Sequence, residues 1–288
     1  MGLLLDSYFG AFKTPKQRAL APFICKHQKV LITGGSNGLG LCLTKSFSKL
    51  LTVEKVIILD LEPPEDTILA NEKVCFYFCD ITQVEMLKQV QKRIVREHGD
   101  ISILINNAGI TNIKPLLSMD DAEITRILQV NFLGAYMVTQ VFLDNLISFG
   151  DSTIINICSI LGVISPANLT AYCAAKACLI SFHKSLKLLM EHSETIHMPR
   201  KIKTLLLCPG KIRTKMFEDV STPSTLFAPD LSPEELSEDI VCAVEGRNRE
   251  QILSPYYANL VPLFQRLEWP YWRLLKKYSG MNEVTNLN

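Results

Sequence analysis

Short apolar runs and helix-like segments alternate along the whole chain, and this alternation limits the folds that it can adopt. Six runs are rich in β-branched or aromatic residues, namely 29–33, 55–60, 73–80, 101–107, 152–159 and 202–208. Continuous apolar runs are typical of parallel strands that are covered on both faces. Helical patterns lie between them, for example over 84–98 and 120–147, and SPEEL starts a further helix with Ser232 as N-cap. The sequence therefore predicts an α/β fold, a three-layer doubly wound parallel sheet in a single domain.

A glycine cluster follows the first apolar run directly and precedes a helical pattern. The sequence VLITGGSNGLGLCL contains Gly34, Gly35, Gly38 and Gly40. Glycines permit a tight turn and close backbone approach, and the next helix offers free N–H groups to a pyrophosphate. The spacing is T-G-x-x-x-G-x-G rather than G-x-G-x-x-G, and a glycine-rich turn without a ligand has the same composition. The position between strand and helix favours a dinucleotide site of the Rossmann type.

Acidic residues at the end of the second run bear on the choice of dinucleotide. Asp60 ends that run, and Glu62 adds a second negative charge. A carboxylate here can accept hydrogen bonds from the adenosine ribose hydroxyls and repels a 2′-phosphate. Neither the glycine loop nor residues 60–66 contain an arginine or lysine that would bind that phosphate. We therefore expect NAD rather than NADP, although a solvated acidic turn also explains Glu62.

Polar residues also follow the third and fourth runs. Asp80 could hydrogen-bond the adenine amino group, and the NNAG sequence places Asn107 and Gly109 where backbone could lie against the cofactor. Ordinary turn chemistry at strand ends is the alternative in both places. Ligands of doubly wound sheets bind at the carboxyl ends of the strands, so we expect these residues near the glycine loop.

A tyrosine and a lysine share one face of a predicted helix. The sequence TAYCAAKACL places Tyr172 and Lys176 four residues apart, a spacing that makes their Cβ atoms neighbours at roughly 5–6 Å. A free tyrosine, with a pKa of about 10, is a poor base at neutral pH, but a nearby ammonium favours the phenolate. We therefore expect Lys176 to lower the pKa of Tyr172 and Tyr172 to act as a general base in alcohol oxidation.

Six motifs occur in an order that resembles the short-chain dehydrogenase/reductase superfamily. They are TGGSNGLG, NNAG, Asn131, Ser159, YCAAK and CPGKIRT. Within it, the YCAAK segment and the following CPG are similar to the branch of type 11 and type 13 17β-hydroxysteroid dehydrogenases and related retinol dehydrogenases. The resemblance implies an NAD-dependent oxidoreductase that interconverts an alcohol and a ketone or aldehyde on a lipophilic substrate, such as a steroid, retinoid or fatty alcohol.

The resemblance also implies roles for individual residues. Asn131, Ser159, Tyr172 and Lys176 would form a catalytic tetrad, in which Ser159 binds the substrate oxygen and Asn131 holds a water that links Lys176 to solvent. Ile212 would orient the nicotinamide carboxamide through its backbone. The residues expected to contact the cofactor are Thr33, Gly34, Ser36, Asn37, Gly38, Leu39, Gly40, Asp60, Asp80, Ile81, Asn107, Ala108, Gly109, Tyr172, Lys176, Pro209, Gly210, Ile212 and Thr214.

Composition argues against several other classes. The formal net charge of +1 gives no overall attraction to nucleic acid. The nine cysteines form no C-x-x-C pair, so we expect reduced thiols and no metal site. The start MGLLLDSYFGAFK lacks the basic region of a signal peptide, and no run approaches 18 continuous apolar residues. These features predict a cytoplasmic protein without a spanning helix.

The predicted domain covers residues 28–255, after an N-terminal extension over 1–27 and with a substrate lid over 211–228. The tail, 256–288, has a basic and aromatic amphipathic pattern. Such a tail would either lie in a membrane interface, at the endoplasmic reticulum or lipid droplets, or cap an apolar substrate cleft. In the resembling family, the helices that carry the tetrad asparagine and tyrosine also form a subunit interface, which implies a homodimer.

Three other functions stay open at this point. An NADPH-dependent carbonyl reductase of lipid metabolism is disfavoured by Asp60. A non-catalytic nicotinamide-binding protein would not need the complete tetrad. A methyltransferase of similar topology fits the glycine loop but leaves Tyr172 and Lys176 unexplained.

Overall fold

A computed structural model of the chain describes residues 27–191, 202–218, 229–246 and 251–254. Its centre is a seven-stranded parallel sheet with the order β3-β2-β1-β4-β5-β6-β7. The strands are β1 (Gln28–Thr33), β2 (Val53–Asp60), β3 (Val74–Phe78), β4 (Ile103–Asn106), β5 (Thr153–Ile157), β6 (Lys203–Pro209) and β7 (Gln251–Ser254). The strand order reverses between β1 and β4, which is the switch point where doubly wound sheets bind ligands.

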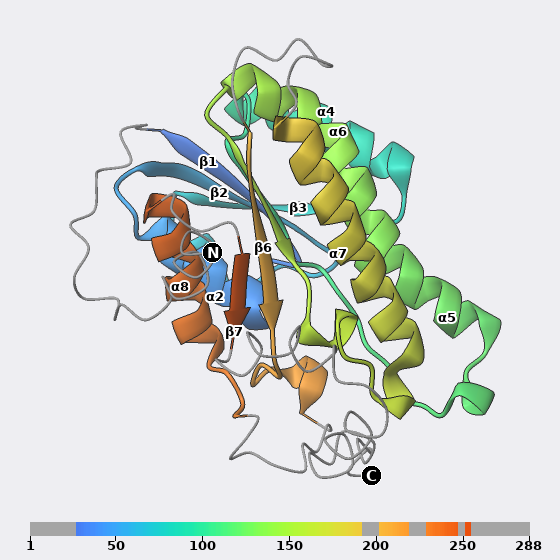
Figure 1. Ribbon diagram of the computed structural model, residues 1–288. Coiled ribbons are helices and arrows are strands. Elements are labelled where there is room, and N and C mark those ends of the chain that lie inside the picture. The colour runs from blue at the N-terminus through green and yellow to red at the C-terminus, as the bar shows by residue number, and fades with distance from the viewer. Residues whose placement is uncertain (1–26, 192–201, 219–228, 247–250, 255–288) are drawn as a thin grey trace, which may run out of the picture.

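Helices cover both faces of the sheet, so the predicted three-layer α/β fold is confirmed (Figure 1). On one face lie α2 (Gly38–Ser48) and α8 (Pro233–Gly246), which pack against each other. On the other face lie α4 (Val84–His98), α6 (Ala135–Phe149) and α7 (Thr170–Glu191). The short helix α3 (Asp66–Leu69) precedes β3, and α5 (Asp121–Leu128) precedes α6.

Both faces of the central strands are buried, as the continuous apolar runs predicted. Val30 and Ile32 of β1 belong to the core cluster under α2 and α8, whereas Leu31 between them belongs to the cluster under α4 and α6. Neighbouring side chains of a strand point to opposite faces, so a strand covered on both sides needs apolar residues at successive positions. The strand β7, which the sequence did not predict, is four residues long and pairs with β6.

The predicted helix over 120–147 is divided into three parts. The helix α5 begins after Asp120, whose carboxylate accepts a hydrogen bond from the Glu123 backbone N–H at 2.7 Å in a capping box. A π-helical turn, η4 (Gln129–Gly134), separates α5 from α6 and contains Asn131. π-helical turns inside α-helices occur frequently at functional sites.

The start of α8 agrees with the sequence prediction. Pro233 is its first residue, and the Ser232 hydroxyl accepts a hydrogen bond from the Glu235 backbone N–H at 3.3 Å. This bond satisfies one of the N–H groups that the first turn of a helix leaves without an intrahelical partner.

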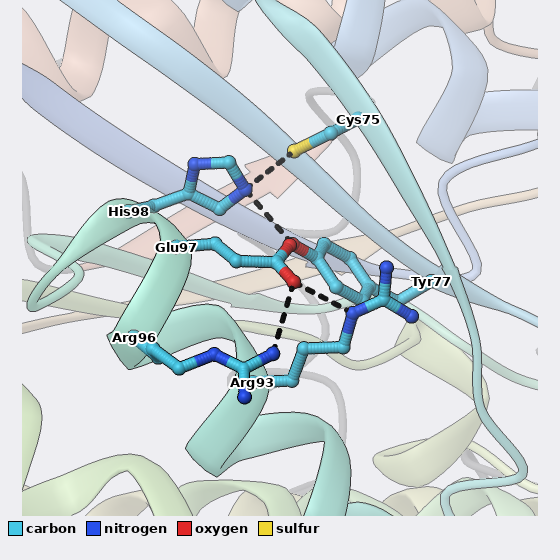
Figure 2. A network of polar contacts seen from close by, with 6 residues as sticks. All are labelled: Cys75, Tyr77, Arg93, Arg96, Glu97 and His98. Atoms are coloured by element: carbon cyan, nitrogen blue, oxygen red, sulfur yellow. Dashed lines mark hydrogen bonds and ion pairs between the residues drawn. The ribbon is translucent and has the colours of Figure 1, made fainter.

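A polar network fastens the end of α4 to the edge strand β3 (Figure 2). The Tyr77 hydroxyl donates to Glu97 Oε2 at 2.5 Å and lies 2.9 Å from His98 Nε2. Because Tyr77 has one proton, which the carboxylate accepts, His98 Nε2 donates to the Tyr77 oxygen. Hydrogen bonds from Tyr77 and Arg93 lower the pKa of Glu97 to about 2.

Within the described residues, one helical segment, Asp121–Phe149, is long and apolar enough to span a membrane. Its inner face includes Val138, Phe142 and Leu146, which are fully buried in the core. Packing on the sheet therefore accounts for part of the apolar composition, since 39% of the most apolar window is buried.

Candidate active site

The glycine loop between β1 and α2 packs tightly on itself and on the end of β4. A Cβ atom at Gly40 would lie 1.9 Å from the Gly34 carbonyl oxygen, and one at Gly34 would lie 2.9 Å from Ala108 Cα. Gly34 also has a φ of +65°, which disfavours other residues. These two glycines therefore give the loop its shape.

Two residues that were predicted to contact the cofactor hold this shape with their side chains. Thr33 Oγ1 accepts hydrogen bonds from the backbone N–H groups of Asn107 and Ala108, at 3.0 and 3.1 Å. Asn107 Nδ2 donates to the carbonyl oxygens of Thr33 and Gly34, at 3.1 and 2.9 Å. Thr33 and Asn107 thus fasten the glycine loop to the end of β4.

The remaining part of the loop is suited to a phosphate. Gly38 has a φ of +53°, and the nearest atom to a Cβ there is Thr214 Cγ2 at 3.2 Å, so the loop after β6 lies beside it. The first turn of α2 contains no acidic residue, and the Asn37 side chain forms no capping bond. The helix N-terminus therefore keeps N–H groups for an anion. The Leu39 side chain is buried in the core, so only its backbone is available to a ligand.

Asp60 lies directly beside the glycine loop. Its Oδ2 accepts the Ser36 backbone N–H at 3.0 Å, and its Oδ1 accepts the Leu61 N–H at 2.8 Å. The Ser36 hydroxyl donates to the Glu62 carbonyl oxygen at 2.6 Å. Each carboxylate oxygen can accept a further bond, so Asp60 combines the charge and the acceptor capacity that suit ribose hydroxyls.

Asp80 and Ile81 lie in the turn after β3. Asp80 Oδ1 accepts from the backbone N–H and the hydroxyl of Thr82, at 2.9 and 2.7 Å, which is the turn chemistry considered as the alternative for this residue. The Ile81 side chain is buried, and a Cβ at Gly134 would lie 2.7 Å from its Cδ1. Ile81 therefore offers a ligand its backbone rather than its side chain.

Tyr172, Ser159 and Lys176 come together at the carboxyl ends of β5 and β6, all at most 5% exposed. Ser159 lies close enough to Tyr172 to lower the pKa of the phenol, and its Oγ accepts the Leu161 N–H at 3.1 Å. The single hydroxyl proton of Ser159 is thus free to be donated toward Tyr172 or a substrate oxygen. Lys176 Nζ donates to the Ile157 carbonyl oxygen at 3.0 Å and lies 5.7 Å from the centre of the Tyr172 ring.

Burial dominates the electrostatics of this group. Burial raises the pKa of the Tyr172 phenol, and the hydrogen bond with Ser159 opposes that rise. Burial also lowers the pKa of Lys176. The effect of Lys176 on the pKa of Tyr172 stays a prediction; in this structure Lys176 Nζ is directed at the Ile157 carbonyl oxygen. The pair nevertheless lies on one face of α7, as predicted.

Asn131 lies in the π-helical turn and is fully buried. Its Nδ2 donates to the carbonyl oxygens of Ile110 and Ile127, at 2.8 and 2.9 Å, and its Oδ1 accepts the Ile110 N–H at 3.3 Å. Both amide protons are thus used, and only Oδ1 has capacity for a water. A Cβ at Gly109 would lie 2.7 Å from Asn131 Oδ1 and 3.6 Å from Lys176 Nζ, so a glycine is needed between them.

The loop after β6 completes the edge of the site. Pro209 ends β6, and Gly210 is buried. The Ile212 side chain lies in the core, and its backbone forms a bridge with Leu231. Only the backbone of Ile212 is available to a ligand, in keeping with the role that the resemblance implies. The part of the predicted lid over 219–228 lies outside the described residues.

Apolar side chains surround the phenol of Tyr172. The Phe217 ring lies edge-on to it, with ring centres 6.0 Å apart. Ile110, Ile113 and Leu161 are partly buried beside the same cluster. These residues were not predicted from the sequence, although Ile110 directly follows the NNAG motif and Leu161 lies two residues after Ser159, so their places at strand ends could have indicated them. Within the described residues, no group of three or more His, Cys, Asp and Glu residues could hold a metal ion.

This combination of a glycine loop at the switch point and a buried Tyr–Ser–Lys group defines a dinucleotide-dependent oxidoreductase. The chain belongs to the short-chain dehydrogenase family, because the family model described as "short chain dehydrogenase" matches residues 28–224. It is 43% identical over 264 residues to "Uncharacterized oxidoreductase YDL114W" of Saccharomyces cerevisiae, covering 91% of this chain and 85% of that protein.

Two other relatives have more specific names. The chain is 34% identical to "Epidermal retinol dehydrogenase 2" of Homo sapiens, over 75% of this chain and 70% of that protein. It is 28% identical to "Estradiol 17-beta-dehydrogenase 11" of Macaca fascicularis, over 91% of this chain and 85% of that protein. These relatives support the predicted branch of the family.

Solved structures support the fold. A short chain dehydrogenase/reductase from Burkholderia phymatum in complex with NAD has a TM-score of 0.73 at 20% identity and covers 84% of this chain and 94% of its own. A short chain dehydrogenase from Burkholderia cenocepacia in complex with NADP has a TM-score of 0.71 at 22% identity, covering 88% and 98%. One of these structural neighbours thus holds NAD and the other holds NADP.

Proposed function

We propose that this oxidoreductase is an NAD-dependent dehydrogenase of lipophilic alcohols in which Tyr172 is the general acid/base. The observation that carries the proposal is the buried group of Tyr172, Ser159 and Lys176 beside the glycine loop. A phenol, a hydroxyl that can donate and an ammonium at one strand edge suit proton exchange with a substrate oxygen.

The chain's own residues perform the acid–base part of this reaction. In the oxidation, the Ser159 hydroxyl donates to the substrate oxygen, and the Tyr172 phenolate accepts the alcohol proton and becomes the phenol. Lys176 holds a positive charge close to Tyr172, which favours the phenolate that acts as the base. NAD, when bound, supplies the hydride acceptor. Its pyrophosphate would lie at the N-terminus of α2 beside Gly38, and Lys176 would reach the nicotinamide ribose.

Asp60 supports NAD over NADP. Its carboxylate is held beside the glycine loop by the Ser36 N–H. Both hydrogen bonds described above come from backbone N–H groups, not from a lysine or an arginine. A 2′-phosphate in this position would meet a negative charge, whereas ribose hydroxyls could donate to it.

The apolar surroundings of Tyr172 support a lipophilic substrate. Phe217, Ile110, Ile113 and Leu161 offer aliphatic and aromatic surface next to the reacting group. Burial of apolar substrate surface contributes about 25 cal/mol per Å². The names of two relatives, a retinol dehydrogenase and an estradiol dehydrogenase, are in keeping with this class of substrate.

The test is a panel of estradiol, retinol and decanol, each incubated with NAD or NADP, with the reduced cofactor followed by absorbance. We expect turnover of at least one of these alcohols and tighter binding of NAD than of NADP by fluorescence titration. Preference for NADP would replace the proposed cofactor and favour a carbonyl reductase. Binding of dinucleotide without turnover of any panel member in either direction would favour a non-catalytic binding protein.

We also propose a homodimer formed by α6 and α7. Four large apolar side chains on η4, α6 and α7 are at least 40% exposed, namely Leu133, Tyr136, Leu188 and Leu189. Self-association would remove this surface from water. Analytical ultracentrifugation should show a dimer that Leu133→Glu with Leu188→Glu dissociates, and a monomeric parent protein would refute the proposal.

Residues 1–26 and 255–288 lie outside the described residues. We propose a cytoplasmic protein that associates peripherally with endoplasmic reticulum or lipid-droplet surfaces through its basic, aromatic tail. Liposome flotation of the full chain and of a chain ending at residue 258 tests this proposal. Equal partitioning of the two proteins would contradict it.

A further inference from the structure

A line of buried polar side chains connects the sheet to α7, away from the reacting groups. Asn106 ends β4, Asn156 lies on β5 and His183 lies on α7, and none is more than 3% exposed. The register of β4 and β5 pairs Asn106 directly with Asn156. Polar groups in a sheet core are costly unless they are hydrogen-bonded; all three side chains are bonded, although Asn106 Oδ1 has no partner.

The hydrogen bonds run outward from Asn106 Nδ2, to Thr139 on one side and through Asn156 to His183 on the other. The Thr139 hydroxyl donates to the Ala135 carbonyl oxygen at 2.8 Å, so its oxygen accepts from Asn106 Nδ2 at 2.9 Å. Asn106 Nδ2 also donates to Asn156 Oδ1 at 2.8 Å, which leaves Asn156 Nδ2 to donate to His183 Nδ1 at 3.0 Å. His183 Nδ1 therefore carries no proton, and the neutral ring carries its proton on Nε2.

The environment of His183 agrees with this protonation state. Burial lowers the pKa of His183 to about 4, with a smaller contribution from the nearby positive charge of Lys187. The ring is thus neutral at physiological pH, and its bare Nδ1 is a permanent acceptor for Asn156.

Two consecutive residues of β5 hold α7 at two separate points. The Ile157 carbonyl oxygen accepts Lys176 Nζ at 3.0 Å, and the Asn156 amide donates to His183 at 3.0 Å. The two helix residues are seven positions apart, which is about 10 Å along the helix axis. Apolar packing is non-directional, whereas a buried hydrogen bond at each point resists both rotation and sliding of the helix.

We propose that Asn156 and His183 are positioning residues that set the rotation and axial position of α7, and thereby place Tyr172 and Lys176 against the reacting atoms. Neither residue touches the phenol, so both act through the helix and through the adjoining Ile157 carbonyl. The inference rests on the proposed function, because it assigns the placement of the proposed general base.

The test compares three variants in the oxidation of estradiol, retinol and decanol by NAD. His183→Leu removes the acceptor, and we expect kcat to fall at least about tenfold, because small misplacements of catalytic groups are costly. We also expect the midpoint of the kcat–pH profile to rise, because a displaced ammonium favours the phenolate less. The affinity for NAD should be unchanged, since the glycine loop is held by other residues.

His183→Asn is the matched rescue variant, because its side-chain oxygen can replace Nδ1 as the acceptor. It should restore most of kcat and the original pH midpoint. The double variant Asn156→Leu with His183→Leu removes donor and acceptor together. Because it also removes the Asn156 oxygen that accepts from Asn106 Nδ2, its unfolding temperature is not compared with that of His183→Leu. It should keep the low kcat, and it serves as a second variant if His183→Leu fails to fold.

The proposal is overturned if a folded His183→Leu or double variant retains the parent kcat and pH midpoint. It is also overturned if His183→Asn is as impaired as His183→Leu. Tyr172→Phe distinguishes these outcomes from failure of the proposed function. Parent-like turnover by Tyr172→Phe would refute the proposed function itself, whereas an inactive Tyr172→Phe beside a fully active His183→Leu would refute only the positioning role.

Discussion

The neutral, buried state of His183 predicts a specific loss of stability in acid. Burial lowers its pKa from 6.5 to about 4, so the folded protein disfavours the proton that the unfolded chain binds. The contribution of His183 is complete above pH 6.5 and is lost progressively as the pH falls toward 4. Each pH unit between the two values costs about 1.4 kcal/mol, so we expect a loss of about 2 kcal/mol between pH 7 and pH 5.

Urea unfolding of the parent protein and of His183→Asn at pH 7 and pH 5 measures this loss. The asparagine keeps a hydrogen-bond acceptor but does not titrate, so carboxylates common to both proteins cancel in the difference. The difference in the free energy of unfolding should change by about 2 kcal/mol between the two pH values, to the disadvantage of the histidine. An equal difference at both pH values would refute the account of a buried neutral ring.

Three further predictions concern the glycine loop, the cofactor and α8. Gly40→Ala should prevent folding, because its methyl group would lie 1.9 Å from the Gly34 carbonyl oxygen. Gly38→Ala should fold, as measured by circular dichroism, and should bind NAD more weakly in a fluorescence titration. Stable folding of Gly40→Ala would contradict this reasoning. Asp60→Ser should raise the affinity for NADP relative to NAD, and an unchanged ratio in fluorescence titrations would refute the role of Asp60. Ser232→Ala should lower the free energy of unfolding by about 1 kcal/mol through loss of the N-cap, a change that urea unfolding would detect.

Local patterns were sufficient to predict the fold and the expected positions of many site residues. Apolar runs identified six strands because strands covered on both faces must be apolar at successive positions. Ser232 and Pro233 marked the start of α8 because a helix N-terminus has distinctive capping needs. Tyr172 and Lys176 lie on one face of α7 because four residues make about one helical turn.

Features that depend on contacts between distant segments could not be predicted in this way. The sequence predicts that Thr33 and Asn107 contact the cofactor. It does not reveal that their hydrogen bonds hold the glycine loop to the end of β4. The pKa of Tyr172 depends on burial and on Ser159, neither of which its helical spacing with Lys176 reveals. The bond between Asn156 and His183 joins residues 27 positions apart, beyond the reach of any helical or strand pattern.

The most direct test of the central claim is the turnover of Tyr172→Phe beside Tyr136→Phe. Both variants remove one phenolic oxygen, but Tyr136 is 42% exposed on α6 whereas Tyr172 is buried beside Ser159. The account predicts that both variants bind NAD like the parent protein, that Tyr136→Phe keeps alcohol oxidation and that Tyr172→Phe loses at least about 100-fold in kcat. Oxidation by Tyr172→Phe at the parent rate would contradict the assignment of Tyr172 as the general base.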